Sequence, residues 1–150
     1  FDSLLGYYAG RDGVCNVEME QHFVESVGWY EKLPTPYFVD ADKELFELFK
    51  GSTREGITIA APGFYAPQGR WVRIAPHDKS LNQKIEEFKY GARRITNFEM
   101  ESSALAGLSR LLGHKAMTVC MVIANRRAQE ANTAYKNSIN DLIVKVLDRI

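Results

Sequence analysis

The sequence alternates between strand-like and helical patterns from residue 57 onward, and this alternation limits the possible folds more than any other feature. The apolar run at 57–61 predicts a strand. Helical spacing then begins at Ser80, where Ser80 and Gln83 are placed as a capping box, and Gly91 is expected to end the helix.

The alternation continues to residue 150. A helix is predicted over 104–112, with Gly113 as its left-handed C-terminal residue. The apolar run at 116–124 predicts a buried strand, and the spacing over 139–150 is that of an amphipathic helix. Strands that alternate with helices indicate an α/β domain, a sheet with helices packed on its faces.

The chain is expected to form a single domain over residues 1–150. No repeat or low-complexity linker divides it, and a chain of this length buries roughly 70% of its surface on folding. A further short helix is predicted from Asp40 to about Gly51, whereas the first forty residues show no sustained period.

Charge and cysteine content exclude several functional classes. The 19 Lys and Arg residues balance the 19 Asp and Glu residues, so nucleic acid and membrane surfaces are not expected partners. Cys15 and Cys120 lie far apart, and the histidines are isolated, so no disulfide framework or metal site is expected. No signal peptide is visible after Phe1, which favours the cytoplasm, and the missing Met suggests that the sequence starts inside a longer protein.

Three segments carry side chains suited to chemistry. The first, 62–70, follows the predicted strand and presents two aromatic rings, an amide (Gln68) and a guanidinium (Arg70). An amide that donates and accepts, beside a group that only donates, matches the imide edge of uracil. A tight surface turn with an aromatic residue in the core explains the same residues.

The second segment, 97–104, places Glu99 and Glu101 just before an apolar helix. In an extended segment the two carboxylates would point the same way, and one could accept both hydrogens of a ribose diol. Acidic residues at a helix N-terminus are also ordinary dipole partners. The third segment, 122–127, is the polar end of the strand predicted at 116–124, the kind of place where α/β folds bind ligands, or simply a solvated basic turn.

Together, GFYAPQGR at 63–70, NFEMESSAL at 97–105 and VIANR at 122–126 resemble the C-terminal part of the nucleoside phosphorylase family, most closely its uridine-specific branch. The resemblance implies a mixed central sheet flanked by helices. It also implies reversible phosphorolysis of uridine to uracil and ribose 1-phosphate, with phosphate as co-substrate, no cofactor, and a homo-oligomer that is a dimer or a hexamer of dimers.

The resemblance also implies roles for individual residues. Arg70 and Glu101 are the expected catalytic groups: Arg70 would stabilise the uracil anion, and Glu101 would hold the ribose 2′-hydroxyl. The expected substrate-binding residues are Phe64, Gln68, Arg70, Glu99, Met100, Glu101, Ile123, Ala124 and Arg126. Purine-specific relatives have an acid after the last strand, where this chain has Ile123-Ala124-Asn125.

The sequence departs from the family at the phosphate site. The family's Gly-Asp-x-x-Arg loop has no convincing counterpart, since Arg11-Asp12-Gly13 matches it only superficially. Phosphate binding is therefore expected to need groups that this chain does not contain, and the N-terminal part of the domain is expected to be absent. Two alternatives remain: a purine phosphorylase or nucleosidase of the same superfamily, and a non-catalytic nucleoside-binding fragment.

Overall fold

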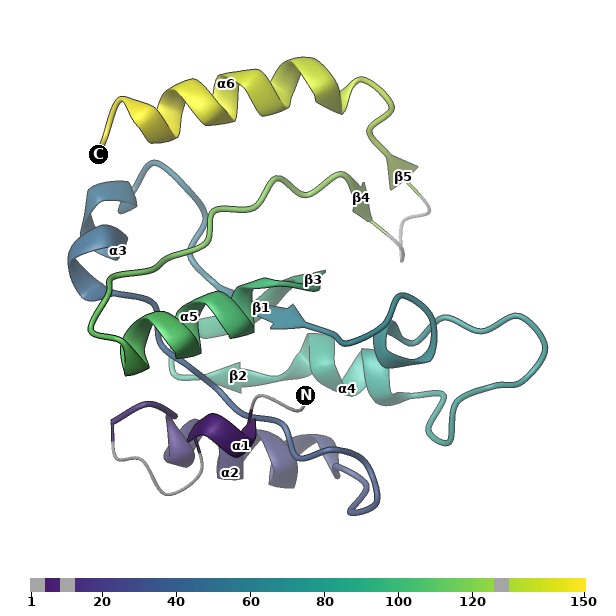
Figure 1. Ribbon diagram of the computed structural model, residues 1–150. Helices are drawn as coiled ribbons and strands as arrows, with labels where there is room; N and C mark the ends of the chain where they lie inside the picture. Colours follow the sequence, from purple (N-terminus) through teal and green to yellow (C-terminus); the bar gives the residue numbers. More distant parts are fainter. Residues whose placement is uncertain (1–4, 9–12, 126–129) are drawn as a thin grey trace.

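The computed structural model describes residues 5–8, 13–125 and 130–150 and shows a small mixed sheet with helices around it (Figure 1). Strand β1 (Ile57–Ala60) pairs in parallel with β3 (Arg93–Glu99), and β2 (Lys89–Tyr90) pairs antiparallel with the other edge of β3. A second, two-stranded sheet joins β4 (Ala124–Asn125) to β5 (Glu130–Ala131). The predicted α/β fold, with a mixed sheet flanked by helices, is confirmed.

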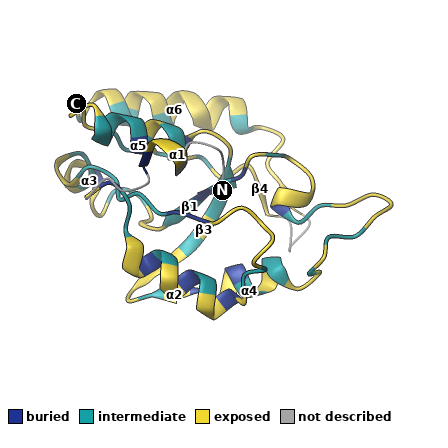
Figure 2. Ribbon diagram, turned by 60° about the horizontal axis from the view of Figure 1, so that its bottom comes forward, coloured by how far each residue is buried: buried dark blue, intermediate teal, exposed yellow. Residues whose placement is uncertain are grey.

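Helices cover both faces of the three-stranded sheet (Figure 2). Helix α5 (Ser102–Leu111) lies on one face, and α2 (Val17–Val27) and α4 (Leu81–Glu87) lie on the other. The buried core forms between the sheet and this second pair of helices; its members are Met19, Phe23, Val27, Ile59, Ala61, Ile85 and Phe88.

Helix α2 was not expected from the sequence, and neither was the central strand β3. Asn16 caps α2, with Oδ1 accepting from the Met19 N–H at 3.1 Å, and Gly28 ends it in the left-handed conformation at φ 62°. Met19, Phe23 and Val27 recur at every fourth position and are all buried. That spacing was the available signal for this helix.

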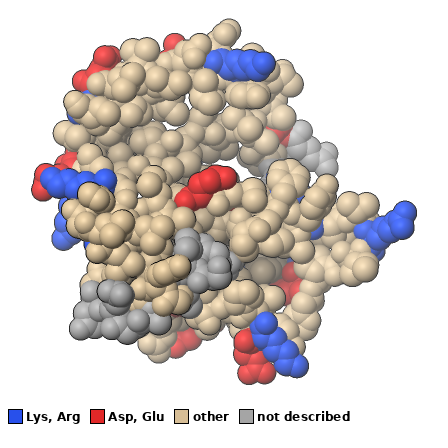
Figure 3. Space-filling view, viewed as in Figure 1, with Lys and Arg blue, Asp and Glu red and all other residues tan. Residues whose placement is uncertain are grey.

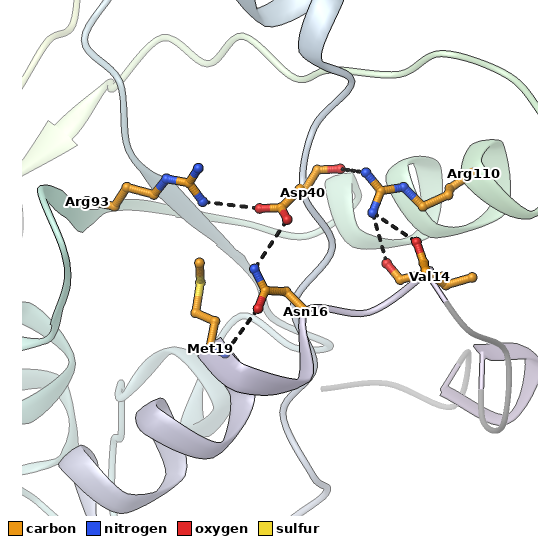
Figure 4. Close-up of polar contacts among 7 residues, drawn as sticks. Val14, Asn16, Met19, Asp40, Arg93 and Arg110 are labelled. Atoms are coloured by element: carbon orange, nitrogen blue, oxygen red, sulfur yellow. Dashed lines mark hydrogen bonds and ion pairs between the residues drawn. The ribbon is translucent and has the colours of Figure 1, made fainter.

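Polar contacts tie the segment before α2 to the rest of the protein (Figure 4). Asn16 Nδ2 and Arg93 Nη1 both donate to the Asp40 carboxylate at 3.2 Å. Arg110 of α5 donates to the backbone carbonyl oxygens of Val14 at 3.2 Å and of Asp40 at 3.1 Å. Four distant parts of the sequence are therefore held at one place.

The two predicted helices on either side of β1 form. The helix expected over 40–51 is α3 (Lys43–Phe49), and its cap Asp42 accepts from the backbone N–H groups of Glu44 and Leu45. The capping box predicted at Ser80 is wrong: the Ser80 side chain makes no cap bond, because its hydroxyl donates to Asp78 Oδ1 at 2.6 Å. Helix α4 also ends at Glu87, before Gly91, since Lys89 and Tyr90 enter the sheet.

The strand predicted over 116–124 is wrong for most of its length. In the described part of the chain, residues 116–123 form no strand, and pairing starts at β4. Ala116 O accepts from Asp42 N and Ile123 O accepts from Asn132 N, so these ends bond to other segments. An apolar run favours a strand, but a neighbouring strand must supply the ladder, and the run does not specify that neighbour.

Two further helices lie toward the chain ends. Helix α1 (Leu5–Tyr8) is short, whereas α6 (Tyr135–Leu147) confirms the amphipathic helix predicted near the C-terminal end. No residue of α6 is buried, and its apolar positions Ile143 and Leu147 are 50% and 62% exposed. Among the described residues, no helix has the length and apolar character needed to cross a membrane.

Candidate functional site

The first two chemistry-bearing segments meet at one edge of the sheet. Because β1 and β3 are parallel, the loop at 62–70 and the turn at 99–102 both leave the carboxyl ends of these strands. The Ala61 N–H donates to Glu99 O at 2.9 Å, which joins the two exits directly. The tertiary structure thus places base-reading and ribose-reading candidates on the same edge.

The loop after β1 closes on itself around Tyr65. The backbone N–H groups of Gln68 and Arg70 both donate to Tyr65 O at 2.9 Å, and Ala66–Gln68 form a short 3-10 helix, η1. Gly69 follows at φ 70°, a conformation that costs a residue with a Cβ about 1–2 kcal/mol. The sequence Pro-Gln-Gly therefore folds the loop so that positions 64, 68 and 70 face one another.

Phe64, Gln68 and Arg70 form a single cluster. Arg70 Nη1 donates to Gln68 Oε1 at 2.6 Å and to Phe64 O at 2.7 Å, and the guanidinium carbon lies 3.7 Å from the centre of the Phe64 ring. Gln68 is 4% exposed, whereas Phe64 is 54% exposed. The structure brings these three predicted residues together and leaves an aromatic face open to solvent.

Asn82 of α4, which was not expected from the sequence to take part, supports this cluster. Asn82 Nδ2 donates to Gln68 O at 3.1 Å. A Cβ added at Gly69 would lie 2.1 Å from the same nitrogen, so the glycine allows the close approach. The signal in the sequence was weak, because an asparagine in the first turn of a helix is common for other reasons.

The turn after β3 holds Glu99, Met100 and Glu101. Strand β3 ends at Glu99, and Glu101 has φ −128° and ψ −27°, so the turn is not the extended segment that the sequence analysis considered. The Glu99 carboxylate accepts from the backbone N–H of Glu101 at 2.8 Å and of Ser102 at 2.7 Å, and from the Ser102 hydroxyl at 2.5 Å. Glu99 therefore interacts favourably with the dipole at the N-terminus of α5, as acidic residues commonly do at this position.

The Glu101 side chain is exposed, and Oε2 accepts from the backbone N–H of Met100 at 3.2 Å. Met100 is 43% exposed. Figure 3 shows acidic side chains in the middle of this face, where β3 ends, with uncharged side chains around them and a hollow beside them. The turn thus presents negative charge within a largely neutral surface.

Cys120, just before the third segment, lies beside β3. The Asn97 side chain of β3 hydrogen-bonds to the Cys120 thiol, whose pKa is raised by partial burial of the sulfur and further by the charges of Glu99 and Glu101. Ile123 and Ala124 are exposed, the latter in β4. Arg126, the last predicted substrate-binding residue, lies outside the described residues.

Two cavities elsewhere in the described part of the chain share no residue with these segments. One, of about 290 Å³, is lined by Ser26, Lys84, Glu87, Phe88 and Lys89. The other, of about 140 Å³, is lined by Asp42, Ala106, Arg110, His114 and Ala116. The polar groups of the candidate site gather at the carboxyl ends of β1 and β3, away from both of these cavities.

Comparisons with known proteins identify the family of the chain. The profile of the phosphorylase superfamily matches residues 5–148. A relative from Thermococcus kodakarensis (strain ATCC BAA-918 / JCM 12380 / KOD1), described as uridine phosphorylase, is 34% identical over 79 residues, which are 53% of this chain and 28% of the relative. The match therefore spans less than a third of that relative's length. No solved structure matches the chain significantly.

Proposed function

The chain belongs to the phosphorylase superfamily, and on that premise we propose that it binds uridine at the β1/β3 edge and serves in its phosphorolysis to uracil and ribose 1-phosphate. The proposal makes the protein a pentosyltransferase with phosphate as co-substrate and no cofactor. The observation that carries it is the cluster of Phe64, Gln68 and Arg70 beside the acidic turn at 99–102.

The cluster supports recognition of the base. Arg70 presents donors only, and its bond to Gln68 Oε1 fixes how the buried amide is turned. The exposed ring of Phe64 offers a face on which a flat heteroaromatic base would pack. An imide edge, with carbonyl oxygens on either side of an N–H, suits this set better than a purine edge does.

The turn supports recognition of the sugar. We assign the ribose 2′-hydroxyl to Glu101, whose carboxylate is exposed, with Met100 packing on the sugar. A hydrogen bond from a hydroxyl to a carboxylate is worth about 1.5 to 3 kcal/mol. Ile123, Ala124 and Arg126 would complete the base-binding side, as the family resemblance implies.

The chemistry follows from where charge develops. Cleavage of the glycosidic bond leaves positive charge on the sugar and negative charge on the uracil oxygens. Arg70 would stabilise the leaving anion through a guanidinium already held in place by Phe64 and Gln68. The bond electrons leave with uracil, and phosphate attacks the sugar carbon from the other side.

Two alternatives make different predictions. A purine phosphorylase or nucleosidase would need an acid to protonate the base, and the sequence has Ile123-Ala124-Asn125 at the expected place. A non-catalytic nucleoside-binding protein would bind uridine without releasing uracil. The residues that bind phosphate are not assigned to positions in this chain. We propose that phosphate-binding groups and a homo-oligomeric assembly complete the site.

The test is a panel of nucleosides with and without phosphate. Uridine, thymidine, inosine and adenosine are offered to the protein, binding is measured by calorimetry, and base release is measured by chromatography. The proposal expects uridine to bind most tightly and uracil release to depend on phosphate. Preference for inosine or adenosine would favour the purine alternative, and binding without release would favour the non-catalytic one.

A further inference from the structure

The carboxylates of Glu99 and Glu101 differ in what they contact, although the sequence presents them as a pair. Glu99 accepts three hydrogen bonds from its own chain: the Glu101 N–H, the Ser102 N–H and the Ser102 hydroxyl. A carboxylate has about four acceptor sites in all. Glu101 accepts one longer bond, from Met100 N at 3.2 Å, and is exposed.

The three bonds of Glu99 fix the entrance to α5. Glu101 is the N-cap residue of this helix, yet its side chain makes no cap bond. The Glu99 carboxylate satisfies the first free N–H groups in its place, from two and three residues earlier in the chain. Since the Glu101 backbone N–H is one of the groups held, the position of the Glu101 side chain depends on this contact.

Ser102 is the second partner in this arrangement. Its side chain is among the few buried polar groups of the described residues, at 8% exposed, and its hydroxyl lies 2.5 Å from Glu99 Oε1. The other end of Glu99 is also anchored, because its carbonyl oxygen accepts from Ala61 N at 2.9 Å. The turn is thus fixed to β1, to the loop that carries Gln68 and Arg70, and to α5.

We propose that Glu99 and Ser102 are positioning residues: through their hydrogen bonds they set the geometry of the 99–102 turn so that Glu101 reaches the ribose 2′-hydroxyl. This inference rests on the proposed function, because it requires that a nucleoside binds at this edge. In this proposal the Glu99 carboxylate binds backbone N–H groups of the protein itself, and the Glu101 carboxylate contacts the sugar.

The test uses the ratio of affinities for uridine and 2′-deoxyuridine, measured by calorimetry on the full chain. Deoxyuridine lacks the hydroxyl that Glu101 would hold, so a change in the position of Glu101 alters the ratio, whereas a general loss of stability weakens both ligands alike. Ser102→Ala removes one of the three bonds to Glu99 and should lower the preference for uridine roughly 2- to 12-fold, the range of one hydrogen bond. Ser102→Thr keeps a hydroxyl and should retain the ratio.

Two further variants serve as a control for the serine change and as a test that Ser102 acts through Glu101. Ser109→Ala makes the same change later in α5, where no bond to the turn is involved, and should leave the ratio unchanged. Glu101→Gln should lower the ratio by itself, and adding Ser102→Ala to it should produce little further change, because both act on one contact.

The outcomes separate the two proposals. If wild-type protein binds uridine and Ser102→Ala weakens uridine and deoxyuridine equally, or neither, the positioning role is overturned while the proposed function stands. A wild-type protein that binds uridine without preferring it to deoxyuridine also overturns the positioning role. A wild-type protein that binds no nucleoside overturns both.

Discussion

The guanidinium carbon of Arg70 lies 3.7 Å from the centre of the Phe64 ring, and the same guanidinium donates to Phe64 O at 2.7 Å. The arginine is therefore held by a ring face and a carbonyl oxygen of one residue six positions earlier. A guanidinium fixed in this way loses little freedom when a ligand binds, so it can act on charge that develops later in the reaction.

Arg70→Ala is expected to lower the rate of uridine phosphorolysis roughly 100- to 1,000-fold, because the leaving uracil anion loses its main stabilising charge. Phosphate-dependent uracil release under single-turnover conditions measures the chemical step. Arg54→Ala, a change at an exposed arginine on the other side of β1 from the loop, is the matched control. An unchanged chemical step in a folded Arg70→Ala variant would refute the role.

Gln68→Ala is expected to reduce kcat/KM for uridine more than for nucleosides without an imide edge. The amide is buried and bonded to Arg70, so its removal takes one acceptor from the guanidinium and leaves the base edge without its amide partner. The measurement compares uridine with inosine for wild-type and variant proteins. Equal losses for both substrates would show that Gln68 supports the loop but does not read the base.

Gly69→Ala is expected to damage the site more than the same change at Gly113. Both glycines have positive φ, 70° and 74°, so each alanine bears a similar conformational cost of about 1–2 kcal/mol. At Gly69 the new Cβ would also lie 2.1 Å from Asn82 Nδ2, whereas nothing lies within 4 Å at Gly113. Urea unfolding and uridine affinity measure the two effects; equal losses in both variants would contradict the close contact with Asn82.

Arg110→Ala is expected to lower the free energy of unfolding by about 2 kcal/mol, because three backbone carbonyl oxygens, those of Gly13, Val14 and Asp40, lose a charged donor. Arg93→Ala should cost less than about 1 kcal/mol, since its ion pair with Asp40 is largely exposed. Urea titration of both variants gives the comparison. A larger loss for Arg93→Ala would show that the exposed ion pair is the stronger contact.

Cys15 is expected to react slowly with thiol reagents near neutral pH, because burial, and after it the charge and hydrogen bond of Glu20, raise the pKa of its thiol to about 11. Only the thiolate reacts, so alkylation should accelerate as the pH rises toward that value. Glu20→Gln removes the second cause and should speed alkylation at pH 8.

That measurement is made by mass spectrometry with Cys120→Ser in both proteins, so that the label reports Cys15. Cys120 is the other free cysteine of the described residues, and its exposed position would otherwise contribute. A rate that stays constant or falls in the Glu20→Gln variant would contradict the assigned influence of Glu20.

Local patterns predicted the elements whose stability depends on near neighbours in the sequence. The short helix before Gly51, the strand at 57–60 and the left-handed Gly113 all appear where their residue types indicate. The predictions failed where a group or a segment could bond to more than one partner. Ser80 bonds to Asp78 and not to its helix, and residues 116–123 lack the neighbouring strand that an apolar run requires.

The same distinction applies to the candidate site, where residue types were predictable and contacts between distant residues were not. The residue types at 64, 68, 70 and 101 indicated a nucleoside chemistry without any coordinates, because donors, acceptors and rings are fixed by identity. Asn82 and Ser102 were not found, since their relevance depends on contacts across 14 residues and across a turn.

The sequence by itself determined the superfamily, the chemical groups available and most helix positions, since these depend on residue identity and short-range spacing. The tertiary structure decided that β1 and β3 run in parallel, which places the Gln68–Arg70 loop and the 99–102 turn at one edge. It also decided that Glu99 serves the turn while Glu101 stays exposed. These outcomes depend on hydrogen bonds between groups that meet only after folding, and local sequence patterns do not encode which of several donors a carboxylate will meet.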